Sequence, residues 1–359
     1  GYAMSDEIQA VKPRLSTARY AIAQGLRTVW YGGHYSLIRR RSSGFSRPGE
    51  PSFTPENGRP DLKVMRKEFF KAYQQDLANI EAGLYPRPRD VSITQLPKAL
   101  RHSRDFIRDA VSVDERRVNR TGTEVREIAD PERYPTYYRQ NFHYQSGGWF
   151  TDESADLYDT QVEVLFTGAA DVMRRCVLGE VARQMKGRDQ RQTEFLDLAC
   201  GTGRFLACVL DAFPRLKASG LDLSPNYSQK ARKAVRRWPQ ADIIEASAEA
   251  MPIEDNSLDL ISSIYLFHEL PPKVRPMVAS EIVRALKPGG AFVFADSLQF
   301  GDMPELDGLL EYFPEGFHEP YYKGYLSEEF DQIFARAGLI AEPVKTAFLT
   351  RIQTWRKPE

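Results

Sequence analysis

The sequence has few cysteines and no long apolar run, and both absences narrow the class of protein. Only three cysteines occur in 359 residues, and Cys176, Cys200 and Cys208 lack the spacing of a zinc site or a disulfide framework. No stretch reaches the ~18 uninterrupted apolar residues of a membrane-spanning helix, and the first residues show no signal-peptide pattern. We therefore expect a cytoplasmic protein without a membrane span.

Histidine is also scarce, and neither positive nor negative side chains predominate in the whole chain. The five histidines never pair at metal-ligand spacing, so we expect no metal site. Lysine plus arginine and aspartate plus glutamate number 49 each, although the first 150 residues hold 25 basic and 17 acidic side chains. These charges are scattered among one another, which indicates a solvated surface and no nucleic-acid partner.

The first half of the chain shows helical patterns. Apolar side chains recur every three or four residues from 61 to 84, which predicts an amphipathic helix: Leu62, Met65, Phe69, Tyr73, Leu77, Ile80 and Leu84. Similar patterns at about 95–112 and 152–186 predict further helices. Residues 1–150 are therefore expected to form a mostly α-helical N-terminal region that covers the substrate or offers a surface to a partner.

From Glu194 onward, short apolar runs alternate with amphipathic helices, which is typical of βαβ units and a parallel sheet. The sequence predicts strands at 194–199, 217–222, 242–246, 258–264 and 291–296, and helices at 203–213, 224–237, 273–286 and 327–337. Runs at 339–346 and 348–355 suit a closing hairpin. The expected fold class is α/β: a Rossmann-like, doubly wound, mostly parallel sheet over residues 151–359.

A glycine turn follows the first predicted strand, in the stretch 195–206 with the sequence FLDLACGTGRFL. Such turns let the backbone approach a ligand at the carboxyl edge of a parallel sheet. The alternative is a tight strand-to-helix connection that binds no ligand. Asp222 ends the next strand about 20 residues later, where a carboxylate can accept hydrogen bonds from both ribose hydroxyls. The third and fourth strands end at the same predicted crevice.

These motifs resemble the class I S-adenosylmethionine-dependent methyltransferases, and within them the methyltransferase type 11 group that includes ubiquinone and menaquinone biosynthesis enzymes. The resemblance covers about residues 160–300 and rests on four segments in order: 196–203 (LDLACGTG), 220–224 (GLDLS), 246–252 (ASAEAMP) and 284–290 (RALKPGG). A nicotinamide enzyme fits less well, because its fingerprint needs a third small residue where Leu206 stands.

The resemblance implies S-adenosylmethionine as the cofactor and assigns its contacts. Residues around the methionine portion would be Asp197, Ala199, Gly201, Gly203 and Ser263. Asp222 would hold the ribose, and the residues around the adenine would be Leu223, Ser247, Ala248 and Glu249. Two positions depart from the family pattern: Ala199 replaces a glycine, and Ser247 stands where an aspartate is common.

Two residues after the fourth strand are candidates for proton transfer. The resemblance places this strand end at the mouth of the substrate pocket. Because an unperturbed histidine titrates near neutral pH, His268 is the first candidate for a general base. Glu269, the next residue, is the second candidate. The alternative is that His268 packs or caps the loop.

Aromatic residues cluster in two further places. In and after the stretch 137–150, candidates for a lid or for contact with the sulfonium are Tyr144, Trp149 and Tyr158, with interdomain packing as the alternative. After the fourth and fifth strands, candidates for the acceptor wall are Tyr265, Tyr321 and Tyr322. We expect methyl transfer to a small, aromatic or partly apolar acceptor, by O-, C- or N-methylation. The alternative is a cofactor-binding regulatory or assembly protein without catalysis.

Overall fold

The computed structural model describes residues 56–57, 62–87, 170–316 and 321–359, and its centre is an eight-stranded sheet. The strands are β1 (Glu194–Leu198), β2 (Lys217–Asp222), β3 (Asp242–Glu245), β4 (Leu258–Ile264), β5 (Leu286–Ser297), β6 (Ile340–Ala341), β7 (Lys345–Ala347) and β8 (Thr350–Arg356). Their order is β3-β2-β1-β4-β5-β8-β6, with β7 also paired to β8. Strands β1 to β5 are parallel, and β8 runs antiparallel to β5.

The predicted fold class is confirmed, with one local difference. The predicted ranges 217–222 and 258–264 coincide with β2 and β4, and β7 and β8 form the expected closing hairpin. The strand predicted at 291–296 is longer than expected, however, because β5 already begins at Leu286. Pairing with β4 is irregular there, and Gly289 has a φ of +79°. Glycine supplies this left-handed conformation inside the strand.

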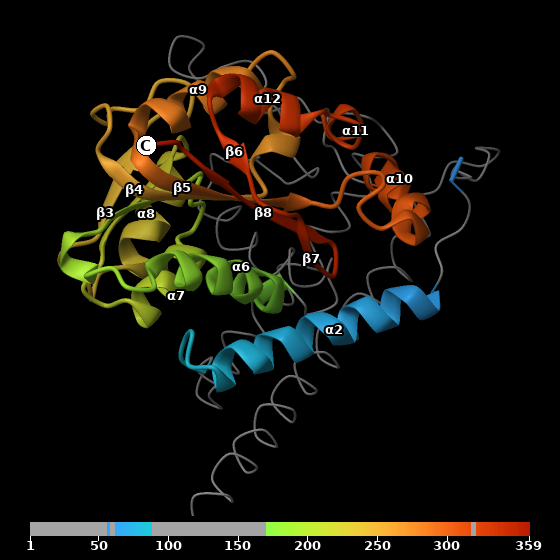
Figure 1. Cartoon of the computed structure of the whole chain (residues 1–359), viewed down its shortest axis with the longest axis horizontal. Coiled ribbons are helices and arrows are strands. Elements are labelled where there is room, and N and C mark those ends of the chain that lie inside the picture. Colours follow the sequence, from blue (N-terminus) through green and yellow to red (C-terminus); the bar gives the residue numbers. More distant parts are fainter. Residues whose placement is uncertain (1–55, 58–61, 88–169, 317–320) are drawn as a thin grey trace, which may run out of the picture.

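Helices cover both faces of the sheet (Figure 1). One face carries α6 (Ala170–Met185), α7 (Arg204–Ala212) and α8 (Pro225–Ala234), and the other carries α9 (Arg275–Ala285) and α12 (Phe330–Ala337). Alternate strand residues supply the two cores, since Phe195 packs with the first group of helices and Leu196 with the second. None of the described helices is long and apolar enough to cross a membrane.

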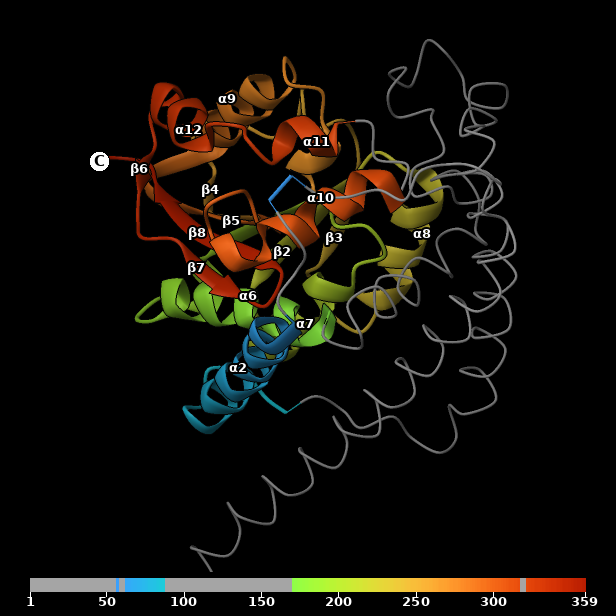
Figure 2. The same cartoon turned by 90° about the vertical axis from the view of Figure 1, so that its right-hand side faces the viewer.

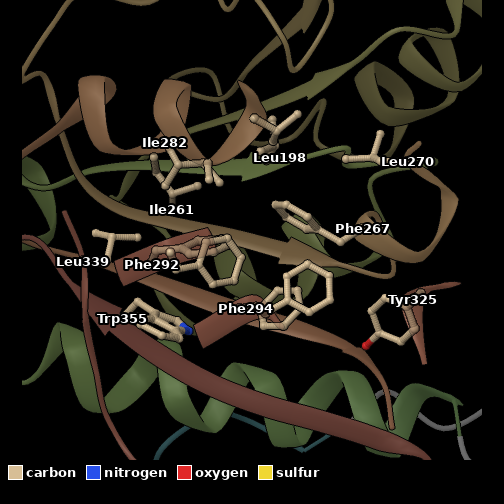
Figure 3. Packing of buried hydrophobic residues seen from close by; sticks show 14 of the residues in the cluster. Leu198, Ile261, Phe267, Leu270, Ile282, Phe292, Phe294, Tyr325, Leu339 and Trp355 are labelled. Carbon is tan, nitrogen blue, oxygen red and sulfur yellow. The ribbon is translucent and has the colours of Figure 1, made fainter. Parts of the chain in front are cut away.

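The second core is rich in aromatic rings (Figure 3). Phe267, Phe292 and Phe294 approach one another with ring centroids 5.4–6.4 Å apart, and Phe334 packs edge-on to Trp355 at 5.2 Å. Such pairs stabilise beyond the area that they bury. This core fixes the 3-10 turn η6 (Phe267–Glu269) to the sheet, because Phe267 is completely buried within it.

Two short helices lie at the carboxyl side of the parallel strands. Figure 2 shows α10 (Asp307–Gly316) and α11 (Tyr322–Tyr325) on the side where β5 ends. The 3-10 turn η7 (Pro304–Leu306) leads into α10. The remaining 3-10 turn, η5 (Gln190–Gln192), joins α6 to the amino end of β1.

Helix α2 (Leu62–Glu81) confirms the helix predicted from the first half of the chain, and it packs on α6 (Figure 1). A buried ion pair joins them: Arg175 donates to Asp76 through Nε (2.9 Å to Oδ1) and Nη2 (2.7 Å to Oδ2). The hydroxyl of Tyr85 also donates to Asp76 Oδ1 at 2.6 Å. The predicted helix at 95–112 and the predicted boundary at residue 150 lie outside the described residues.

We expect the substitution Asp76→Ala to lower the free energy of unfolding by about 3–5 kcal/mol, because it leaves the guanidinium of Arg175 buried without its carboxylate. Chemical denaturation with a spectroscopic readout measures this change. The matched control is Asp211→Ala, which removes the exposed partner of Arg237 and should cost less than about 1 kcal/mol. Equal effects of the two substitutions would contradict the role assigned to the buried pair.

Candidate functional site

The candidate site lies where the strand order reverses. β1 pairs with β2 on one side and with β4 on the other, so the connections after β1 and β4 leave the sheet in opposite directions. Open α/β sheets bind their ligands in the crevice outside the carboxyl ends at such a point. At this edge, the glycine turn follows β1, Asp222 is the last residue of β2, and η6 follows β4.

The glycine turn combines three residues in the left-handed region. The φ angles of Ala199, Gly201 and Gly203 are +57°, +54° and +80°. A Cβ on Gly203 would meet Ala231 Cα at 2.9 Å, so only glycine fits between α7 and α8 there, whereas a Cβ on Gly201 would meet nothing within 4 Å. Ala199 adopts this conformation despite its methyl group, which costs roughly 1–2 kcal/mol. The turn therefore offers an open backbone face beside Gly201.

Asp222 is tied to this turn. Its Oδ2 accepts a hydrogen bond from the backbone N–H of Gly201 (2.9 Å), and its Oδ1 accepts one from the N–H of Ser224 (2.9 Å). Burial raises the pKa of Asp222 to about 6, and these backbone donors oppose that rise. Each carboxylate oxygen can accept a second hydrogen bond, so the side chain is suited to a pair of ligand hydroxyls.

Two neighbouring positions carry buried polar groups at the ends of β1 and β4. Asp197 Oδ1 accepts a hydrogen bond from Ser262 Oγ at 2.9 Å, and burial raises the pKa of Asp197 to about 7. Within the described part of the chain, the buried hydroxyl of Ser263 has no hydrogen-bond partner. Ser263 pairs with Leu198 in the register of β1 and β4, so its backbone lies next to the start of the glycine turn, while its side chain lies on the opposite face of the sheet from Asp197.

The residues predicted near the adenine lie beside Asp222. In the register of β2 and β3, Asp222 pairs with Glu245, and the N–H of Ala246 donates to the carbonyl of Asp222 at 3.0 Å. The half-buried residues that follow these two strand ends are Leu223, Ser247, Ala248 and Glu249. Ser247 Oγ accepts from the N–H of Glu249 at 3.2 Å. The contacts of these residues with an adenine stay predictions.

The structure adds a carboxylate to the predicted proton-transfer residues. His268 is buried, and its Nδ1 lies 2.7 Å from Oδ1 of Asp296, the penultimate residue of β5. The N–H of His268 donates to Oδ2 of Asp296 at 3.3 Å, and the N–H of Ser297 donates to Oδ1 at 2.7 Å. Glu269 lies on the other side of the ring, with Oε1 3.8 Å from Nε2 of His268.

Sequence reasoning missed Asp296, although a signal was present. The residue is an aspartate at the end of an otherwise apolar strand, which is the same pattern that identified Asp222. Fully buried, it accepts hydrogen bonds from two backbone N–H groups. A carboxylate held in this way fixes the orientation of the histidine ring.

Tyrosines surround the ring of His268. The centroid distances are 5.6 Å to Tyr322, 6.0 Å to Tyr325 and 6.4 Å to Tyr265. We call these three residues the tyrosine wall. Tyr265 is a second non-glycine residue with a positive φ, +57°, and its hydroxyl hydrogen-bonds to Thr350.

Among the other predicted aromatic residues, Tyr321 is half-buried at the start of α11, where its carbonyl accepts from Arg275 Nη2 at 3.1 Å. It therefore adjoins the tyrosine wall through Tyr322. Tyr144, Trp149 and Tyr158 lie outside the described residues. In the parts of the chain that the structure describes, no group of three or more His, Cys, Asp or Glu side chains is arranged to hold a metal ion.

Comparison with known families identifies the core of this site. Residues 195–290, from β1 to the start of β5, match the family described as "Methyltransferase domain". The chain is 33% identical over 139 residues to a demethylmenaquinone methyltransferase of Chlorobaculum tepidum, which covers 39% of this chain and 54% of that protein. It is 28% identical over 200 residues to a malonyl-[acyl-carrier protein] O-methyltransferase of Paenibacillus sp., with 53% and 68% covered. The chain thus spans about half the length of the first of these relatives.

A solved structure is similar to this chain in fold. The CurJ carbon methyltransferase covers 96% of this chain and 98% of its own, with a TM-score of 0.50 and 14% sequence identity. At this identity the likeness concerns the fold alone.

We expect Asp222→Ala to weaken the binding of S-adenosylmethionine by about 1.5–3 kcal/mol, the scale of hydrogen bonds to a charged group. Isothermal titration calorimetry measures the change. The control Asp242→Ala alters an exposed aspartate at the amino end of β3, on the opposite edge of the sheet, and should leave the affinity unchanged. Unchanged affinity in Asp222→Ala would remove Asp222 from the site.

Cofactor affinity should also depend on pH through Asp222. Above about pH 7 the carboxylate is ionised and accepts hydrogen bonds, whereas protonation below its pKa of about 6 removes that capacity. We expect the affinity to fall by up to about tenfold per pH unit below pH 6. Because the folded-state pKa is raised, the contribution of this group to folding improves as the pH falls, so its protonation does not unfold the protein.

The variant Asp222→Asn isolates this effect, since Asp197 titrates in the same range. Calorimetric titrations of both proteins between pH 5 and 8 should give a steeper decline for the parent than for the variant. Parallel curves would assign the pH dependence to another group.

Proposed function

This chain carries a class I S-adenosylmethionine-dependent methyltransferase domain, and from that premise we propose that the protein transfers the cofactor's methyl group to a small-molecule acceptor. The family match supports this proposal for residues 195–290. Three features support a cofactor site at the carboxyl edge of the sheet: the reversal of strand order, the glycine turn and Asp222. The acceptor and the reaction type of the whole protein are part of the proposal.

The described residues fit the cofactor, which supplies an electrophilic methyl group on a cationic sulfur. Asp222 would accept hydrogen bonds from the ribose hydroxyls, and the residues facing the methionine portion would be Asp197, Ala199, Gly201, Gly203 and Ser263. Leu223 would pack against the adenine, whose amino edge would meet Ser247, Ala248 and Glu249. The open face beside Gly201 and the hydrogen bond from its N–H to Asp222 are the observations that support this assignment.

The pair of His268 and Asp296 is the observation that carries the proposed chemistry. With Asp296 ionised, His268 donates its Nδ1 proton to the carboxylate, so Nε2 carries the basic lone pair. Nε2 would accept the proton that the acceptor loses. Glu269 lies 3.8 Å from Nε2, and its charge contributes to the raised pKa of Asp222. Its charge therefore acts on both the proposed base and the proposed ribose site.

The surroundings of His268 indicate the class of acceptor. A base is needed when the acceptor must lose a proton to become nucleophilic, as a phenol, a quinol or an acidic C–H group must, whereas a neutral amine attacks without it. The tyrosine wall surrounds the ring with flat, partly apolar side chains, of which Tyr265 is half-buried and Tyr322 and Tyr325 are buried, and we propose that such a molecule binds beside it. We therefore favour O- or C-methylation of an aromatic or enolisable acceptor. The demethylmenaquinone methyltransferase among the relatives bears a name consistent with this class.

We also propose that the protein is located in the cytoplasm. The three cysteines of the chain are all free, and Cys176 and Cys200 are buried. Free thiols suit a reducing compartment.

Calorimetry with S-adenosylmethionine, followed by a screen of quinols, phenols, 1,3-dicarbonyl compounds and amines for formation of S-adenosylhomocysteine, tests the function. Binding with turnover of a proton-losing acceptor supports the proposal. Binding without any turnover would favour a regulatory or assembly protein, and absence of binding would refute the assignment.

With an acceptor in hand, we expect His268→Gln to lower kcat by about 100- to 10,000-fold, the usual contribution of a general base. The affinity for S-adenosylmethionine should change less than about threefold, which also shows that the variant is folded. Asp296→Asn should lower kcat as well and shift the pH profile of the rate. If His268→Gln kept the parent rate across the pH range, the histidine would have only a packing role.

A further inference from the structure

Arg275 is the first residue of α9, and its side chain is completely buried. An arginine keeps its charge in a protein, so a guanidinium without access to water needs several hydrogen-bond acceptors. Nε donates to the carbonyl of Phe267 (3.1 Å), Nη1 to Oε2 of Glu328 (2.9 Å) and Nη2 to the carbonyl of Tyr321 (3.1 Å). One guanidinium thus joins η6, the residue before α11, and the connection between α11 and α12.

The bond to Phe267 acts on the peptide group that carries the N–H of His268. A peptide group is planar, so its carbonyl oxygen and its N–H move together. The oxygen accepts from Arg275, while the N–H donates to Oδ2 of Asp296 at 3.3 Å. The group is therefore held from both sides, by α9 and by β5. Its rotation would move the imidazole away from Oδ1 of Asp296, which lies 2.7 Å from Nδ1.

The bond to Tyr321 acts in the same way on Tyr322. The carbonyl of Tyr321 belongs to the peptide group that carries the N–H of Tyr322, and it also accepts from the N–H of Tyr325 at 3.1 Å. Arg275 therefore holds the start of α11, which supplies two members of the tyrosine wall. The rings of His268 and Tyr322 lie 5.6 Å apart, and the same guanidinium bonds to the peptide group before each of them.

Other contacts fix the guanidinium and its carboxylate partner. Oε1 of Glu328 accepts from the N–H of Glu329 at 3.1 Å, and the carbonyl of Glu328 accepts from Gln299 Nε2 at 2.9 Å. The guanidinium of Arg275 lies over the ring of Phe330, 5.9 Å from its centroid. Because the donors of a planar guanidinium point in fixed directions, the acceptors also keep fixed positions relative to one another.

We propose that Arg275 is a positioning residue that sets the places of His268 and Tyr322 relative to each other. The inference rests on the proposed function, since His268 is the proposed base and Tyr322 belongs to the wall beside which the acceptor binds. The alternative is that Arg275 and Glu328 only stabilise the fold, in which case neutral side chains could replace the ion pair without a further effect. Removal of both charges together distinguishes these two roles.

The experiment compares Glu328→Gln with the double variant that also carries Arg275→Met. Glutamine keeps an acceptor oxygen, so the single variant should retain both carbonyl bonds, whereas the double variant loses them and leaves no buried charge unpaired. With an acceptor in hand, we expect kcat of the double variant to lie about 10- to 100-fold below that of the single variant, the effect of a misplacement of about 1 Å. The affinity for S-adenosylmethionine, measured by calorimetry, should be the same in both, which also shows that both are folded.

Proton NMR gives a second readout that requires no acceptor. A histidine N–H that is donated to a carboxylate in a short hydrogen bond resonates far downfield of the backbone amides. Its absence in His268→Gln identifies the signal of His268. We expect the parent and Glu328→Gln to show this signal and the double variant to lose it, because a displaced imidazole exchanges its proton with water.

The matched control is Arg188→Met at the amino edge of the sheet. Arg188 also donates to a backbone carbonyl and to a carboxylate, those of Gln184 (3.1 Å) and Asp259 (3.4 Å), but it touches neither η6 nor α11. This substitution should leave kcat and the NMR signal unchanged.

Arg275→Lys keeps the inference testable if the double variant does not fold. It retains the positive charge, but its single nitrogen cannot serve acceptors in three directions, so kcat should fall here too. Parent-like kcat and an intact NMR signal in either folded variant would overturn the inference, while methyl transfer by the parent would still support the proposed function. Absence of cofactor binding in the parent would refute the proposed function itself.

Discussion

The parallel pairing of β1 with β2 on one side and β4 on the other is the constraint on which the site depends. It places the carboxyl ends of these strands at one edge and sends their connections apart, so no helix closes over the gap between them. Residues that are far apart in the sequence therefore meet at this edge of the sheet. Asp197, Asp222 and His268 lie at the same edge of the sheet for this reason.

The hydrophobic layers make that arrangement rigid. Alternating residues of each strand fill two cores, and aromatic rings pack the layer beneath η6, where Phe267 anchors the turn that presents His268 (Figure 3). The buried Asp296 then sets the orientation of the imidazole from the neighbouring strand. Packing therefore positions the imidazole of His268, and hydrogen bonding orients it.

Most of the sheet and the glycine turn could be predicted from the sequence, because alternating apolar runs, glycines and strand-end acids are local signals. The pairing of Asp296 with His268 could not, since it joins residues 28 positions apart and depends on how η6 turns. Arg175 was missed for a related reason. Periodicity marks the apolar face of a helix but does not identify an arginine that is buried by a contact with another element, as Arg175 is by its contact with Asp76.

The ion pair of Asp76 and Arg175 also has a consequence for how this protein can change over evolution. It fixes α2 to α6, which are consecutive described helices separated by more than 80 residues of chain. The entropy of closing a loop grows only with the logarithm of its length, so each doubling costs about 0.6 kcal/mol. Insertions or deletions between these helices are therefore thermodynamically cheap.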